Sequence, residues 1–149
     1  MISFARSVLI RSMLVAPLAC DRPADQHPDI PPAPVFRQVL ARDLETYFAR
    51  AESTPIHVTY ELLREQPTIT GIAYPKYYVW VQIRSGERLL RVGAVRLAAV
   101  NDTFEVIDFL PAAAINSDTS IVGSVFPAPL AADIIRRARA APPVPKRGA

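Results

Sequence analysis

The sequence predicts an α+β fold: one N-terminal helix packed on a curved antiparallel sheet of about four strands, with a C-terminal helix. Three observations predict it. Apolar residues recur at three- and four-residue spacing over residues 35–52, as on the buried side of a helix. Residues 77–83 alternate in the pattern of a strand,. Short turn sequences then separate this strand from two more, which favours antiparallel neighbours.

Composition limits the function classes. The chain has 149 residues, of which 50% are apolar, enough for one domain with a real core,. Its net charge of +3 includes Arg6 and Arg11, so the remainder is nearly neutral, which argues against nucleic acid as a partner. With two histidines, His27 and His57, and five single glycines, the sequence indicates no metal site, phosphate loop or cofactor.

The N-terminus has the pattern of a secretory leader. Arg6 and Arg11 form a positive start, residues 12–19 are largely apolar, and Ala19 precedes the lone Cys20,. We interpret residues 1–20 as a signal peptide with a lipobox-like end, and residues 21–34 as a Pro-rich tether. This order resembles bacterial lipoproteins, although Pro17 stands where that family usually has leucine. The resemblance implies lipid on Cys20 and a location on the periplasmic side of an envelope membrane; plain secretion and a cytoplasmic protein remain open alternatives.

The first folded elements follow the tether. The helix expected over residues 35–52 carries Val39, Leu40, Leu44 and Phe48 on its apolar side,. At 1.5 Å per residue it spans about 27 Å, so it can lie across a sheet. Residues 56–63 alternate as a further strand, with His57 on the outer face,. Residues 65–74 contain proline and glycine and are expected to form a loop or a poorly paired edge strand,.

Three consecutive strands form the centre of the predicted fold. Ser85 and Gly86 follow the first, and Asn101 and Asp102 separate the second, residues 87–100, from the third; both pairs are typical of tight hairpin turns. Strict alternation places Asp108 in the third strand on the same face as Phe104, Val106 and Leu110. Gly93, inside the second strand, predicts a bulge or bend.

Residues after Pro111 give weaker signals. We expect a helical turn at residues 112–115, a strand at 121–126 and a helix at 129–140,. Arg136, Arg137 and Arg139 at the end of that helix complement its dipole. Residues 141–149 are expected to be a disordered tail, which leaves a single domain at residues 35–140.

A helix followed by a curved antiparallel sheet resembles the cystatin-like and NTF2-like α+β architectures. The resemblance rests on the order of elements over residues 35–110 rather than on a sequence motif. It implies either a pocket between helix and sheet, as in ligand binders and enzymes of the NTF2-like group, or an assembly module of an envelope machine.

Few residues are candidates for chemistry. Asp108 would be a desolvated general base if its face lined the helix–sheet interior, and His57 is its only acid–base companion; the alternative is that Asp108 is exposed or paired with an arginine. Tyr74, Tyr78 and Trp80 are candidates for binding, because one helix covers only one face of a sheet. The alternative is that the C-terminal segment buries them.

Together these patterns predict a non-enzymatic ligand- or protein-binding or assembly module, attached to a bacterial envelope membrane through its N-terminus. The alternative is a small NTF2-like enzyme or small-molecule binder that uses Asp108.

Overall fold

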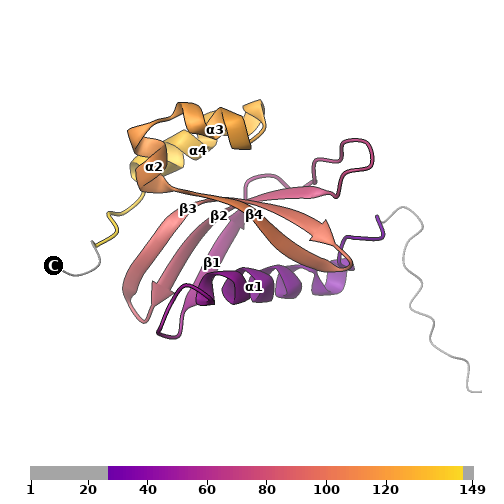
Figure 1. Ribbon diagram of the computed structural model, residues 1–149, viewed down its shortest axis with the longest axis horizontal. Coiled ribbons are helices and arrows are strands. Elements are labelled where there is room, and N and C mark those ends of the chain that lie inside the picture. The colour runs from indigo at the N-terminus through magenta and orange to yellow at the C-terminus, as the bar shows by residue number, and fades with distance from the viewer. Residues whose placement is uncertain (1–26, 146–149) are drawn as a thin grey trace, which may run out of the picture.

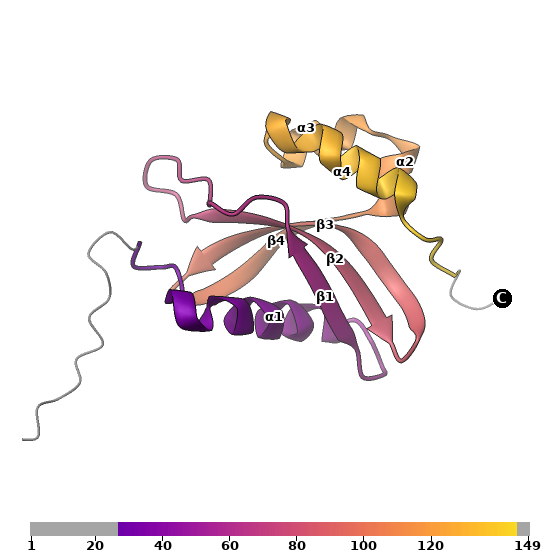
Figure 2. The same ribbon diagram turned by 180° about the vertical axis from the view of Figure 1, so that it is seen from behind.

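The computed structural model describes residues 27–145 as three layers, with a four-stranded sheet between two helical layers. Helix α1 (Ala33–Ala49) lies on one face of the sheet, and α2 (Ala112–Ser117), α3 (Ser120–Val125) and α4 (Ala128–Ala140) lie on the other (Figures 1 and 2). The predicted α+β class, with an N-terminal helix on an antiparallel sheet and a C-terminal helix, is confirmed. The additional helices complete a second covering layer.

The sheet is a meander in which each strand pairs with the next. Strands β1 (His57–Leu62), β2 (Lys76–Ser85), β3 (Arg88–Val100) and β4 (Thr103–Pro111) stand in chain order and are all antiparallel. The two predicted tight turns are confirmed. Gly86 has a φ of 57°, and Asn101 and Asp102 have φ values of 48° and 60°; left-handed backbone of this kind matches the twist of two-residue hairpins.

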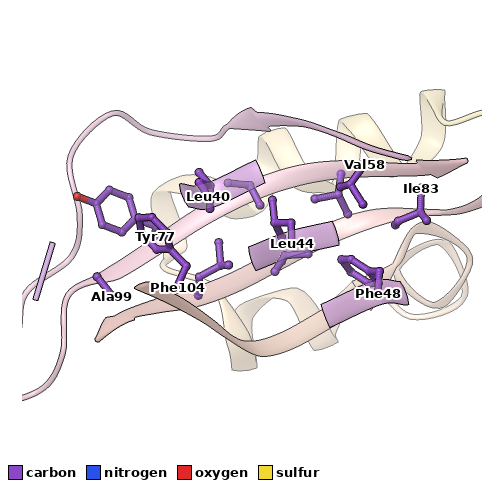
Figure 3. Close-up of a cluster of buried hydrophobic side chains, with 12 residues drawn as sticks. Leu40, Leu44, Phe48, Val58, Tyr77, Ile83, Ala99 and Phe104 are labelled. Atoms are coloured by element: carbon purple, nitrogen blue, oxygen red, sulfur yellow. The ribbon is translucent and has the colours of Figure 1, made fainter. Parts of the chain in front are cut away.

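The first core lies between α1 and the sheet (Figure 3). Leu40, Leu44 and Phe48 are four residues apart and all point into it, because side chains at that spacing share one side of a helix. They pack on Val79 and the other odd-numbered apolar residues of β2. Phe48, predicted on the apolar side of the helix, is 1% exposed, and Val79 is fully buried.

A bulge in β4 changes which face its residues occupy. Leu97 pairs with Val106, but the preceding Arg96 pairs with Asp108, so Ile107 is the extra residue. An inserted residue reverses the inward and outward alternation beyond it. The prediction that Asp108 shares a face with Phe104 and Val106 is therefore wrong. Val106 packs toward α1, whereas Asp108 lies opposite Arg96 on the side of the C-terminal helices.

The second core lies between the sheet and the C-terminal helices. Ile115 of α2, Val122 of α3 and Ile134 of α4 are fully buried there. The strand predicted at residues 121–126 is instead α3. Val122 and Phe126 are both buried and lie four residues apart, which is helical spacing. An apolar run this short is compatible with either a helix or a strand, so its length could not decide between them.

The folded region begins within the predicted tether. Helix α1 starts at Ala33, and Asp29 accepts a hydrogen bond from the Asn101 N–H through its carboxylate at 3.0 Å. The Asp102 N–H donates to the backbone carbonyl of Asp29 at 3.2 Å. The turn between β3 and β4 therefore holds Asp29 in place. Residues 21–26 of the predicted tether lie outside the described residues, together with the predicted leader.

Candidate functional site

The aromatic candidates on β2 are buried. Tyr78 is 3% exposed and Trp80 is 8% exposed, within the core beneath the C-terminal helices. The Tyr78 ring lies 5.9 Å from that of Phe126, measured between centroids, and Ile134 belongs to the same cluster. The prediction that Tyr78 and Trp80 form an open binding face is therefore wrong. The apolar sides of α3 and α4 cover them, since an apolar sheet face excludes water most effectively under a second layer.

An ion pair fastens α4 to the edge strand β1. The Arg137 guanidinium donates to both carboxylate oxygens of Glu61, at 2.8 and 2.7 Å, and through Nε to Asp133 at 2.7 Å. Hydrogen bonds to Glu61 and Asp133 raise the pKa of Arg137. The same guanidinium lowers the pKa of each carboxyl group, chiefly by hydrogen bonding. Arg137, interpreted from the sequence as a dipole-complementing residue, thus also forms a tertiary contact.

The structure does not bring the two acid–base candidates together. His57 is in β1 and Asp108 is in β4, the two edge strands of a four-stranded sheet. Neighbouring strands are about 4.8 Å apart, so three intervals separate these strands by about 14 Å. Each side chain also has its own partner. Arg96 donates through Nε to Asp108 at 2.7 Å, and His57 Nδ1 lies 2.9 Å from Glu45 Oε1.

Arg96 connects the Asp108 pair to the C-terminal layer. Its Nη1 donates to the carbonyl oxygen of Val125 at 3.2 Å, at the end of α3. A carboxylate that accepts a charge-assisted hydrogen bond from an arginine orients that arginine for its second contact. This geometry supports a structural role for Asp108, which is the alternative left open by the sequence.

Two carboxylates of α1 bind backbone groups of the edge strands. Asp43 accepts from the Phe104 N–H of β4 at 2.8 Å, and Glu45 accepts from the Val58 N–H of β1 at 3.2 Å. Edge strands carry outward-facing N–H groups that favour association with other chains. Sequence reasoning missed both contacts, because Asp43 and Glu45 look like ordinary exposed residues of an amphipathic helix. They satisfy one exposed donor on each edge.

A groove of about 450 Å³ runs between α1 and β4. Its helical wall is formed by Asp43, Thr46, Tyr47 and Arg50, and its other wall by residues 103–106 of the edge strand. The Tyr47 ring packs against Phe48 at 5.0 Å between centroids and is still exposed at the groove. The volume lies within the range of small-ligand and peptide sites. The groove is lined by two carboxylates, Asp43 and Glu105, by one arginine, Arg50, and by the exposed ring of Tyr47.

Tyr74 is the one aromatic candidate that lies on the surface. It follows Ile69 and Ile72 in the loop between β1 and β2, and all three side chains are exposed. The predicted loop over residues 65–74 has no regular secondary structure apart from a single antiparallel bridge between Thr68 and Lys76, and it carries these three exposed side chains.

Neither the remaining predicted sites nor the comparisons with known proteins assign a function to the described residues. Cys20 lies outside the described residues. Within residues 27–145, no group of three or more histidine, cysteine, aspartate or glutamate residues is arranged to hold a metal ion, and no helix has the length and apolar character needed to cross a bilayer. Comparison with protein-family models, curated proteins and solved structures found no match. The resemblances to bacterial lipoproteins and to cystatin-like and NTF2-like folds therefore stay predictions.

Proposed function

We propose that this protein is a non-enzymatic binding module, attached to a bacterial envelope membrane through its N-terminus, and that it binds a segment of a partner protein in the groove between α1 and β4. The groove is the observation that carries the proposal. Tyrosine and arginine contribute disproportionately to binding energy at protein interfaces, and Tyr47 and Arg50 are both exposed in one wall.

The groove suits a polypeptide better than a compact small molecule. It is an open channel beside an edge strand rather than an enclosed cavity, and its strand wall is formed by four consecutive residues, 103–106. Phe104 and Val106 point toward the core with α1, while Glu105 is exposed. An extended segment can place apolar side chains near Tyr47 and charged ones near Arg50 and Glu105. The Phe104 N–H already donates a hydrogen bond to Asp43, so it is not available to pair with the backbone of a bound segment. Recognition would therefore depend mainly on side-chain contacts.

The contacts of Asp108 favour this proposal over the enzymatic alternative. A general base must be free to accept a proton from a bound substrate. Asp108 instead bonds Arg96, which in turn bonds the end of α3. His57, at the far edge of the sheet, has Glu45 as its neighbour.

Site-specific photo-crosslinking in cells tests the groove. A photoreactive amino acid at Tyr47 should give a discrete protein adduct, and the additional change Arg50→Glu should reduce its yield. The matched control carries the same amino acid at Arg136, which is exposed on α4 in the opposite layer. Equal adducts from both positions, or none from Tyr47, would contradict a binding role for the groove.

Cell fractionation with intact-mass measurement tests the anchor. Wild-type protein should be found in the membrane fraction with a mass that corresponds to lipid on Cys20 and loss of residues 1–19. The Cys20→Ser variant should be released or remain unprocessed, since a covalent lipid supplies the membrane affinity. Wild-type protein of full, unmodified mass in the cytoplasm would refute the anchor.

A further inference from the structure

The loop between β1 and β2 projects from the sheet, and backbone hydrogen bonds fix both its base and its tip. Thr68 and Lys76 exchange two backbone hydrogen bonds, at 2.9 and 2.8 Å, and so close its base. At the tip, the Ala73 N–H donates to the Thr70 carbonyl at 3.1 Å, and Gly71 takes a φ of 57° inside this turn. A glycine with positive φ at the first central position is typical of a tight reverse turn. The backbone therefore sets the position of the tip.

The tip presents apolar side chains to solvent. Residues 69–74 are all exposed; Ile72 is wholly so, and Ile69 and Tyr74 are each about half exposed. Residues 66–75 contain no charged side chain; Arg64 and Glu65 precede them and Lys76 follows them. Removing an isoleucine side chain from water is favourable, so these exposed side chains favour a surface that can bury them. Three large apolar side chains exposed within six residues of one loop are a candidate contact surface,.

The described N-terminus lies at the same end of the molecule as this loop. β2 begins where β3 ends, since Lys76 pairs with Ala98, so the β1–β2 loop and the β3–β4 turn share one end of the sheet. Asp29 binds Asn101 and Asp102 of that turn. Figures 1 and 2 show the first described residues and the loop emerging at this end from opposite views.

Covalent geometry limits how far this end can be from an anchor at Cys20. Seven residue steps lead from Cys20 to His27, and a fully extended chain spans at most about 3.6 Å per residue, or about 25 Å in total. A lipid on Cys20 would therefore keep the end that carries Ile69, Ile72 and Tyr74 close to the bilayer surface. The Gly86–Glu87 turn lies at the opposite end of β2.

We propose that the β1–β2 loop inserts Ile69, Ile72 and Tyr74 into the interfacial layer of the lipid bilayer that holds the N-terminus, and so fixes the orientation of the domain. The inference rests on the N-terminal anchor of the proposed function. Isoleucine side chains enter the boundary of the acyl chains, and tyrosine is favoured at the level of the headgroups. Arg64 and Lys76 outnumber Glu65 at the base of the loop, and this positive balance complements anionic headgroups,.

Quenching by brominated lipid tests the loop directly. Full-length protein carrying Ile72→Trp is purified from membranes and reconstituted on vesicles of phosphatidylethanolamine and phosphatidylglycerol with bromine on one acyl chain. Wild type supplies the background from Trp80, which is buried. We expect the added emission to shift to the blue and to lose most of its intensity. The control Glu87→Trp, at the opposite end of the sheet, should float with the vesicles and keep its emission.

The outcomes separate the two proposals. If the protein floats with the vesicles but the Ile72→Trp emission is equal with and without bromine, the anchor is supported and the loop insertion is refuted. The exposed loop would then be a contact site for a protein partner. Protein that does not float overturns the anchor and the loop insertion together. Quenching of both variants overturns the defined orientation.

Discussion

Replacing Gly93 with alanine should destabilise the protein by about 2 kcal/mol, because the new methyl group would collide with strand β4. A Cβ atom at this position would lie 2.2 Å from the carbonyl oxygen of Leu110, 2.9 Å from Phe109 Cε2 and 2.9 Å from the Cα of Pro111. Two of these three atoms belong to the backbone of β4. The strand itself must therefore move away from β3.

The magnitude follows from two opposing effects. Inserting a methyl group into a packed core typically costs about 1–3 kcal/mol, and contact with backbone favours the upper end of that range. Alanine restricts the unfolded chain and so returns about 0.4–1 kcal/mol. The displaced Phe109 ring also packs edge-to-face on Phe48 at 5.1 Å between centroids, so its movement disturbs the core under α1. The net expectation is a loss of about 2 kcal/mol.

Urea unfolding followed by far-UV circular dichroism measures this loss. The matched control is Gly123→Ala in α3, where an added Cβ meets no atom within 4 Å. That change should stabilise the protein by up to about 1 kcal/mol, because alanine is the better helix former. An unchanged midpoint for Gly93→Ala, with an unchanged slope, would show that β4 does not approach β3 as closely as described.

Three further predictions concern the two cores and the ion pair between α4 and β1. Iodide should quench the fluorescence of Trp80 weakly and its emission should be blue-shifted, since the indole is buried under α4; strong quenching would show that this layer is open. Phe48→Ala should cost about 3–5 kcal/mol in urea unfolding, and a loss of only a few tenths would mean that α1 does not dock. Glu61→Gln should cost about 0.5–1 kcal/mol at pH 7, a small value because the carboxylate is exposed. Hydrogen bonds from Arg137 lower the pKa of Glu61, so its contribution is present above the unfolded value near 4.3 and is lost as pH falls through the lower folded value. Unfolding at pH 3 should therefore show a smaller difference between wild type and Glu61→Gln than at pH 7, and an equal difference would contradict the ion pair.

Local patterns predicted the sheet well, because each turn carries its own chemistry. Gly86 and the Asn101–Asp102 pair adopt the positive φ that their types tolerate,. The two-residue turns then fix the order and direction of β2, β3 and β4. The apolar side of α1 could likewise be read from its spacing. These features depend on residues a few positions apart.

The contacts between distant residues could not be read in the same way. Asp43 and Phe104 are 61 positions apart, and Arg137 and Glu61 are 76 apart. A charged residue on a helix surface has the same local sequence pattern whether it faces water or a strand edge. The groove between α1 and β4 depends on such placement, so no pattern around Tyr47 or Arg50 indicated it.

The β4 bulge explains why Asp108 was assigned to the wrong face. Alternation counts residues, and a single unpaired residue such as Ile107 reverses every assignment after it,. Phe109, rather than Asp108 or Leu110, then points toward Phe48. A hint was present in the sequence: uninterrupted alternation would bury the Asp108 carboxylate and expose Phe109, and a bulge between Val106 and Asp108 corrects both.

The burial of Trp80 could have been inferred from the sequence, because both faces of the predicted sheet are largely apolar. The face of the sheet opposite α1 carries Tyr78, Trp80, Val92 and Ala94 beside the Arg96–Asp108 pair, so this face too is largely apolar. A sheet with two apolar faces needs a covering layer on each side. The segment after Pro111 is the only described part of the chain left to form that layer, and its three helices do so. An aromatic strand face is therefore evidence for a binding surface only after every remaining apolar segment has been placed. In the described part of this fold, the exposed large apolar side chains include those of the β1–β2 loop and Tyr47 of the α1–β4 groove.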